Sequence, residues 1–172
     1  MGFEYGLLAV RLGLGLAIAA HGAQKLFGWF GGHGLAGTGG FFEAIGFRPG
    51  KPFAAIAGFG EGAGGLLIAL GLFGPVGPAL VLATMIVAAV AVHLKNGFWA
   101  ANNGVELAYV YAFGALAIAF AGFGSLSLDT LLRITPTSPS AVYGVLAVGA
   151  IAGLLTLPLR RPAPQPAPVT SA

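Results

Sequence analysis

The chain of 172 residues contains no cysteine and very little charge, since only 8% of its residues are Asp, Glu, Lys or Arg. Without cysteine it can form no disulfide, thiolate metal site, iron–sulfur cluster or dithiol redox centre. A typical soluble domain is about 25% charged, because its surface must stay hydrated. The scarcity of charge therefore excludes an ordinary soluble enzyme, a nucleic-acid-binding protein and a disordered chain.

The sequence is instead rich in apolar residues, with 57% hydrophobic residues, 30 glycines and a mean hydropathy of +0.90. A transmembrane helix needs about 20 mostly apolar residues. We expect spans at about 5–27, 52–73, 76–94, 105–123 and 141–159. We expect the first to be a retained helix rather than a cleaved signal peptide, because Glu4 is the only charge before the apolar run and Arg11 interrupts that run.

The expected fold is therefore an all-α, polytopic membrane bundle. Residues 1–130 form a four-helix membrane domain, and residues 131–160 add a linker and a fifth transmembrane helix. Residues 161–172 alternate Pro and Ala and predict a disordered tail.

The basic residues predict how this bundle lies in the membrane. With five spans, one side of the membrane holds only Arg133. The other side holds six basic residues: Lys25, Arg48, Lys51, Lys95, Arg160 and Arg161. Because cytoplasmic loops are rich in Lys and Arg, we expect the C-terminus in the cytoplasm and the N-terminus outside, in the cell inner (cytoplasmic) membrane.

Glycine has two expected roles. Residues 28–40 are too glycine-rich for a regular helix, and Thr38 is expected to cap a short amphipathic segment over 39–47. Within the spans, small residues let helices pack closely in lipid. Such small-residue faces are expected at Gly13, Ala17 and Ala20 of the first span and around Glu61 of the second. The glycines around Glu61 either allow close helix packing or leave room for a ligand beside the carboxylate.

Two charges lie inside expected spans, Arg11 in the first and Glu61 in the second. Antiparallel neighbours would bring them to a similar depth, and an unpaired charge there costs several kcal/mol. We expect Arg11 and Glu61 to pair as a buried polar centre. The pair either fixes helix register or forms a site for a substrate or proton.

A second polar group gathers at the expected cytoplasmic ends of the helices: His21, Lys25, His93, Asn96 and Glu106. Lys25 follows His21 by four residues and shares its helix face, and the loop between His93 and Glu106 is short enough to bring them within reach. These residues either cap helix ends or form a quinone and proton site. Quinone carbonyl oxygens accept hydrogen bonds, and His or Glu takes up protons.

Haem fits this group less well than quinone, because haem pockets in bundles place histidines further inside the helices. No intrinsic cofactor, metal site or catalytic residue is identified from the sequence. His33, alone among glycines, is expected to be solvated.

These residues also carry a family resemblance. The run from His21 to Gly28 and the glycines around His33, followed by Gly37-Thr38 and Phe41-Phe42-Glu43, resemble the N-terminal signature of the DoxX family. Further resemblance lies in the segments 58–65, 93–98, 104–107 and 127–129. The resemblance implies a four-helix membrane bundle, beyond which the fifth segment is an addition. Members are named after a small subunit of a terminal quinol oxidase, and relatives belong to thiosulfate–quinone oxidoreductases.

The sequence therefore predicts an accessory membrane subunit of a respiratory or detoxifying oxidoreductase, which binds quinone or quinol or anchors a redox partner. Expected partners are the lipid bilayer, an oxidoreductase and further copies of the chain, but not nucleic acid. A small proton-coupled transporter using Glu61 and a purely structural assembly subunit are the alternatives.

Overall fold

The computed structural model describes residues 2–134 and 138–161, and within these residues it is helical with no strand. The principal helices are α1 (Gly2–Phe27), α2 (Gly34–Ala44), α3 (Gly50–Leu70), α4 (Val76–Ala88), α5 (Glu106–Ala121), α6 (Leu128–Leu131) and α7 (Pro139–Thr156). Short turns supplement them: η1 (Trp29–Gly31), η2 (Ala89–His93), η3 (Leu94–Asn96), η4 (Ala100–Asn102) and η5 (Leu157–Leu159). The all-α membrane bundle expected from the sequence is confirmed.

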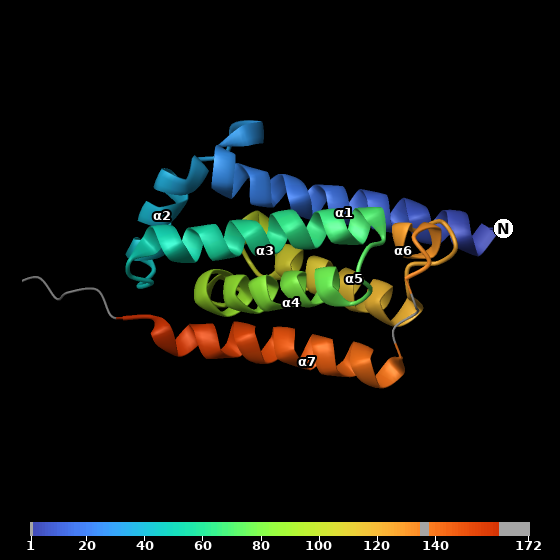
Figure 1. The fold of residues 1–172 in the computed structure, drawn as a ribbon. Coiled ribbons are helices and arrows are strands. Elements are labelled where there is room, and N and C mark those ends of the chain that lie inside the picture. The colour runs from blue at the N-terminus through green and yellow to red at the C-terminus, as the bar shows by residue number, and fades with distance from the viewer. Residues whose placement is uncertain (1, 135–137, 162–172) are drawn as a thin grey trace, which may run out of the picture.

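Helices α1, α3, α4 and α5 form the bundle, and α7 lies along the outside of α4 (Figure 1). The N-terminus, the α3–α4 turn, α6 and the start of α7 gather at one end, called here the N-terminal end. The end of α1, helix α2, the α4–α5 connection and the end of α7 gather at the opposite end, called the α2 end.

Every expected span contains a helix, but one of these helices is shorter than expected. Gly2–Phe27, Gly50–Leu70, Val76–Asn96 and Pro139–Leu159 are long and apolar enough to cross a membrane. Helix α5 has 16 residues, which is about 24 Å at 1.5 Å per residue. The expected tail over 161–172 lies, apart from Arg161, outside the described residues.

Glycines set the distance between α1 and α3. A Cβ on Gly22 would lie 2.3 Å from the backbone nitrogen of Gly62, and a Cβ on Gly15 would lie 2.6 Å from the carbonyl oxygen of Gly65. These contacts fix an antiparallel register with the two backbones touching. The expected small face of the first span was wrong, since Gly13 is exposed with no atom near its Cβ position.

Close backbone contacts at glycines also hold α7 against α4. Cβ atoms on Gly149 and Gly153 would lie 2.5 and 2.7 Å from the carbonyl oxygens of Ala79 and Ala83. Equal spacing of the two contacts means that α4 and α7 run in the same direction. The additional C-terminal helix is thus part of the packed molecule.

The glycine-rich residues 28–40 were expected to be irregular, which holds for 28–33 but is wrong for 34–40, where the helix continues into the expected segment over 39–47. Helix α2 begins at Gly34, so Thr38 lies within it rather than at its cap, and its hydroxyl donates to the carbonyl of Lys25 at 3.3 Å. Tertiary packing explains the helix, because Phe42 is buried against Phe47 and Ala54. Such packing outweighs the low helix propensity of glycine.

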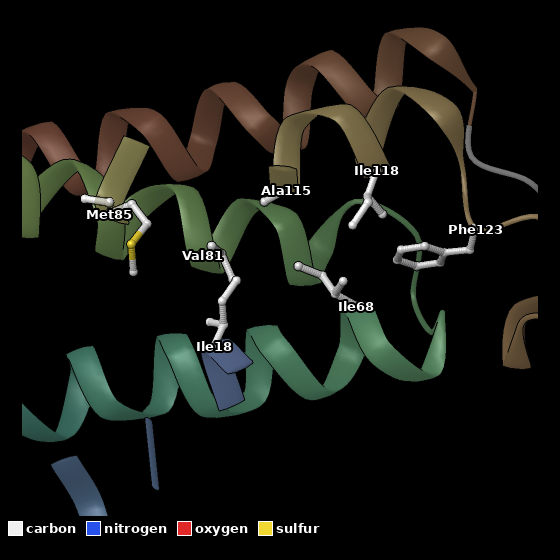
Figure 2. Packing of buried hydrophobic residues seen from close by; sticks show 8 residues of the cluster. Ile18, Ile68, Val81, Met85, Ala115, Ile118 and Phe123 are labelled. Atoms are coloured by element: carbon white, nitrogen blue, oxygen red, sulfur yellow. The ribbon is translucent and has the colours of Figure 1, made fainter. Parts of the chain in front are cut away.

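The centre of the bundle is a buried hydrophobic core. Ile18, Ile68, Val81, Ala115 and Ile118 are all at most 2% exposed and converge from α1, α3, α4 and α5 (Figure 2). Phe123 closes this core toward the N-terminal end, and Met85 bounds it toward the α2 end (Figure 2). The core therefore separates the polar groups at the two ends of the bundle.

Candidate functional site

Arg11 and Glu61 do not pair, so the expected buried polar centre was wrong. The glycine register places Arg11 level with the end of α3, and Glu61 about ten residues further along the bundle, or about 15 Å. Arg11 is 1% exposed and its guanidinium donates to backbone carbonyls from the N-terminal end. The acceptors are Phe123, Ala69 at 3.4 Å and Leu126 at 2.9 Å.

This arrangement gives Arg11 a structural role. Its hydrogen bonds join the last turn of α3 to the segment after α5, and its guanidinium lies 5.6 Å from the centre of the Phe123 ring. The planar guanidinium of an arginine presents several N–H donors in fixed directions, so it can bond three carbonyls better than the ammonium of a lysine would. Gly71 leaves room for it, because a Cβ there would lie 2.9 Å from Arg11 Cζ.

Glu61 pairs instead with Lys25. The Lys25 ammonium bonds the carboxylate of Glu61, whose side chain is only 5% exposed, while that of Lys25 is 28% exposed. Lys25 stands near the C-terminal end of α1, and its long side chain carries the charge inward to the carboxylate. A buried carboxylate without such a partner would be strongly unfavourable.

A second polar pair lies on the same side of the bundle. The Nε2 atom of His21 is 3.1 Å from the hydroxyl of Tyr111, and the two rings meet edge to face at 5.6 Å between centroids. His21 precedes Lys25 by one helical turn, so α1 presents both side chains on one face, as the sequence predicted.

Both pairs line a single cavity of about 400 Å³ inside the α2 end of the bundle. Helices α1, α3, α4 and α5 form its sides, and Phe41 and Phe42 of α2, with Ile45 directly after α2, lie over it. The remaining wall is largely aliphatic: Ala57, Met85, Val87, Ala88, Val92, Leu107 and Ala108. The cavity thus joins a few polar groups to an apolar enclosure, as ligand sites commonly do.

The backbone next to this cavity departs from a regular helix. Residues Ala89–His93 continue α4 as a π-helical turn. Such turns are rare and often occur at functional sites, because one extra residue rotates the side chains that follow. Here the turn ends at His93, which lines the cavity and whose Nδ1 atom is 2.8 Å from the carbonyl oxygen of Asn103.

Two of the expected site residues lie elsewhere. Asn96 donates to the carbonyl of Asn103 at 3.1 Å, and the Glu106 carboxylate accepts from the backbone nitrogen of Ala100 at 2.8 Å. His93 and Glu106, which the short loop was expected to bring within reach, bond to different parts of the α4–α5 connection. His21, Lys25 and His93 are brought together, and Asn96 and Glu106 shape the loop beside them.

Tyr111, Phe41 and Phe42 were not identified as site residues from the sequence. Tyr111 lies in an apolar helix, and the one available signal was a hydroxyl group in the middle of an expected span. Phe41 and Phe42 lie in the amphipathic segment expected over 39–47, but its pattern did not indicate that they would face a cavity.

The glycines around Glu61 serve helix packing. A Cβ on Gly60 would lie 2.5 Å from Thr84 Oγ1, and one on Gly58 would lie 2.7 Å from Leu26 Cγ. His33 is exposed, and among residues 2–134 and 138–161 no three His, Asp or Glu side chains gather as a metal site would require.

A family model described as DoxX matches residues 6–94, just over half of the chain. The match contains α1 to α4 with His21, Lys25, Glu61 and His93, and it ends before Tyr111. No curated protein and no solved structure matches the chain. With its several apolar helices, the chain is a multi-pass membrane protein that belongs to the DoxX family.

Proposed function

We propose that this chain is a quinone- or quinol-binding membrane subunit of an oxidoreductase system, and that the cavity at the α2 end receives the ring head group. The observation that supports this most is the convergence of the His21–Tyr111 and Lys25–Glu61 pairs on one apolar cavity. A volume of about 400 Å³ is within the usual range for small-molecule sites.

The polar side chains have the chemistry that a quinone head group needs. Its two carbonyl oxygens accept hydrogen bonds, and the Tyr111 hydroxyl and Lys25 ammonium are donors on different helices. Oxidation of a quinol to the quinone releases two protons and two electrons. His21 and Glu61 are the groups positioned to take protons, and the electrons pass to a redox partner outside this chain.

The apolar wall matches the remainder of such a ligand. Phe41 and Phe42 offer aromatic faces, and Met85 offers a polarisable thioether that adapts to an irregular shape. A ring held between these side chains presents its edge to the polar pairs.

The charge distribution supports an orientation for the proposed subunit. The α2 end carries Lys25, Arg48, Lys51, Lys95, Arg160 and Arg161, and of these Arg48, Lys51, Lys95, Arg160 and Arg161 are exposed. By the positive-inside tendency this end faces the cytoplasm of the inner membrane, with the N-terminus outside. Protons released at the cavity then leave on the cytoplasmic side, where a peripheral redox partner would also dock.

Binding of a short-tailed benzoquinone to the purified protein in mild detergent tests this function. Tyr111→Phe removes one donor, worth about 1 kcal/mol, and should weaken binding roughly fivefold. Tyr143→Phe is the matched control, because Tyr143 lies on α7 away from this cavity. Solvent extraction and mass spectrometry should find a quinone in the protein as purified.

Two results would contradict the proposal. One is the absence of saturable quinone binding, and the other is equal weakening by both tyrosine variants. Proton uptake into liposomes that Glu61→Gln abolishes, in protein that binds no quinone, would support the transporter instead.

A further inference from the structure

Buried side chains close the cavity in two directions. Toward the N-terminal end lie Ile18, Val81 and Ala115 of the core, each 0% exposed (Figure 2). Over α3 and α4 the cavity is covered by Phe42, which packs with Phe47, Ala54 and Ala91 in a second cluster of buried residues. Access from either of these directions would require repacking of buried side chains.

One side is different. Among the residues that line the cavity, Phe41 of α2, Asn103 of the α4–α5 connection and Leu107 of α5 are also exposed on the outer surface. Phe41 is 47% exposed and Leu107 is 46% exposed. These three exposed lining residues mark the most accessible side of the cavity, called here the opening, between α2 and the start of α5.

The chemistry of the opening changes along its length. Phe41 and Leu107 are apolar, whereas Asn103 is polar and belongs to the loop at the end of the bundle. Beyond Leu107 the outer surface of α5 continues with Tyr109, Val110 and Phe113, each about half exposed. Since the chain is a membrane protein with α5 in its bundle, this surface meets lipid near the membrane–water interface.

Building on the proposed function, we propose that the ligand is an amphiphile with an apolar tail, dissolved in the bilayer, which enters sideways between α2 and α5. Its polar head group lies against Tyr111 and Lys25, and its tail leaves over Leu107 and Phe41 into lipid. A water-soluble molecule with no tail would instead enter past Asn103.

The absence of cysteine makes a direct test simple, because one introduced thiol is the only labelling site. Bimane is attached to Leu107→Cys and, as the control, to Phe120→Cys, which is also exposed on α5 but about 20 Å further along the helix. The probe is a decyl-tailed benzoquinone with a nitroxide on its tail. The binding of a benzoquinone without a tail is measured for comparison.

We expect saturable quenching of the label at position 107, reversed by excess unlabelled decyl-benzoquinone, and only weak, non-saturable quenching at position 120. Saturable binding of both quinones without saturable quenching at 107 would overturn the lateral route and leave the proposed function intact. If neither quinone binds saturably, the proposed function fails as well. A Tyr111→Phe background should shift the saturable quenching to higher probe concentration, which links the tail position to the head-group site.

Discussion

The ammonium group of Lys25 and the carboxylate of Glu61 are joined across the α1–α3 interface, next to the close contact of Gly22 with Gly62. Because the glycines fix the register of the two helices, they also decide which basic residue can reach the buried carboxylate. Helix packing and the polar site therefore have a common origin in the small residues of α1 and α3.

Removal of Lys25 should destabilise the protein by leaving the Glu61 charge without its partner. For Lys25→Met we expect a loss of about 2 kcal/mol, below the range for fully buried pairs because Lys25 is partly exposed. Thermal unfolding in detergent measures it. Lys51→Met is the matched control, since Lys51 is exposed, and Lys25→Met combined with Glu61→Gln should recover much of the loss. An equal effect of both single lysine variants would contradict the pairing.

Gly22→Ala should be strongly destabilising, although alanine is the better helix former. The added Cβ would lie 2.3 Å from the Gly62 nitrogen, so α1 and α3 must separate. Overpacking of this kind costs about 1–3 kcal/mol. The control is Gly13→Ala in the same helix, where nothing lies within 4 Å of the Cβ position and propensity alone predicts an unchanged or slightly higher melting temperature. Equal responses would mean that the interface does not depend on Gly22.

Arg11→Met should loosen the N-terminal end of the bundle without affecting the cavity. The substitution leaves buried carbonyls of Ala69 and Phe123 without donors, at a cost of about 1–3 kcal/mol. Hydrogen exchange of residues 122–133 should accelerate, while quinone affinity stays unchanged. Arg133→Met, at an exposed position of the same end, serves as the control. A selective loss of quinone binding in Arg11→Met would restore Arg11 to the functional site.

Arg160 should hold helix α2 in place over the cavity. Its Nε atom donates to the carbonyl of Ile45 at 3.0 Å and its guanidinium lies 5.9 Å from the centre of the Phe47 ring. In Arg160→Ala, hydrogen exchange of residues 34–44 should rise several-fold, because local opening becomes easier. Arg161→Ala is a close control, since the contact of Arg161 with Gly46 uses its backbone nitrogen. Unchanged exchange in Arg160→Ala would show that α7 does not restrain α2.

Several features of this protein follow from the sequence alone. Low charge and apolar runs of about 20 residues indicated helices in lipid, because a helix satisfies its own backbone hydrogen bonds and needs that length to cross a bilayer. The spacing of His21 and Lys25 placed both on one helix face, and the structure brings them to one cavity. These conclusions depend on local composition and helical periodicity, which the sequence carries directly.

The tertiary structure decided which polar groups meet. Depth counted along each span predicted an Arg11–Glu61 pair, but contacts such as Gly15 on Gly65 shifted the helices until Lys25 stood beside Glu61. Tyr111 and the phenylalanines of α2 joined the site through packing between segments distant in sequence. Interhelical register depends on close backbone contacts at a few glycines, and no property of a single helix specifies which of its glycines will make them.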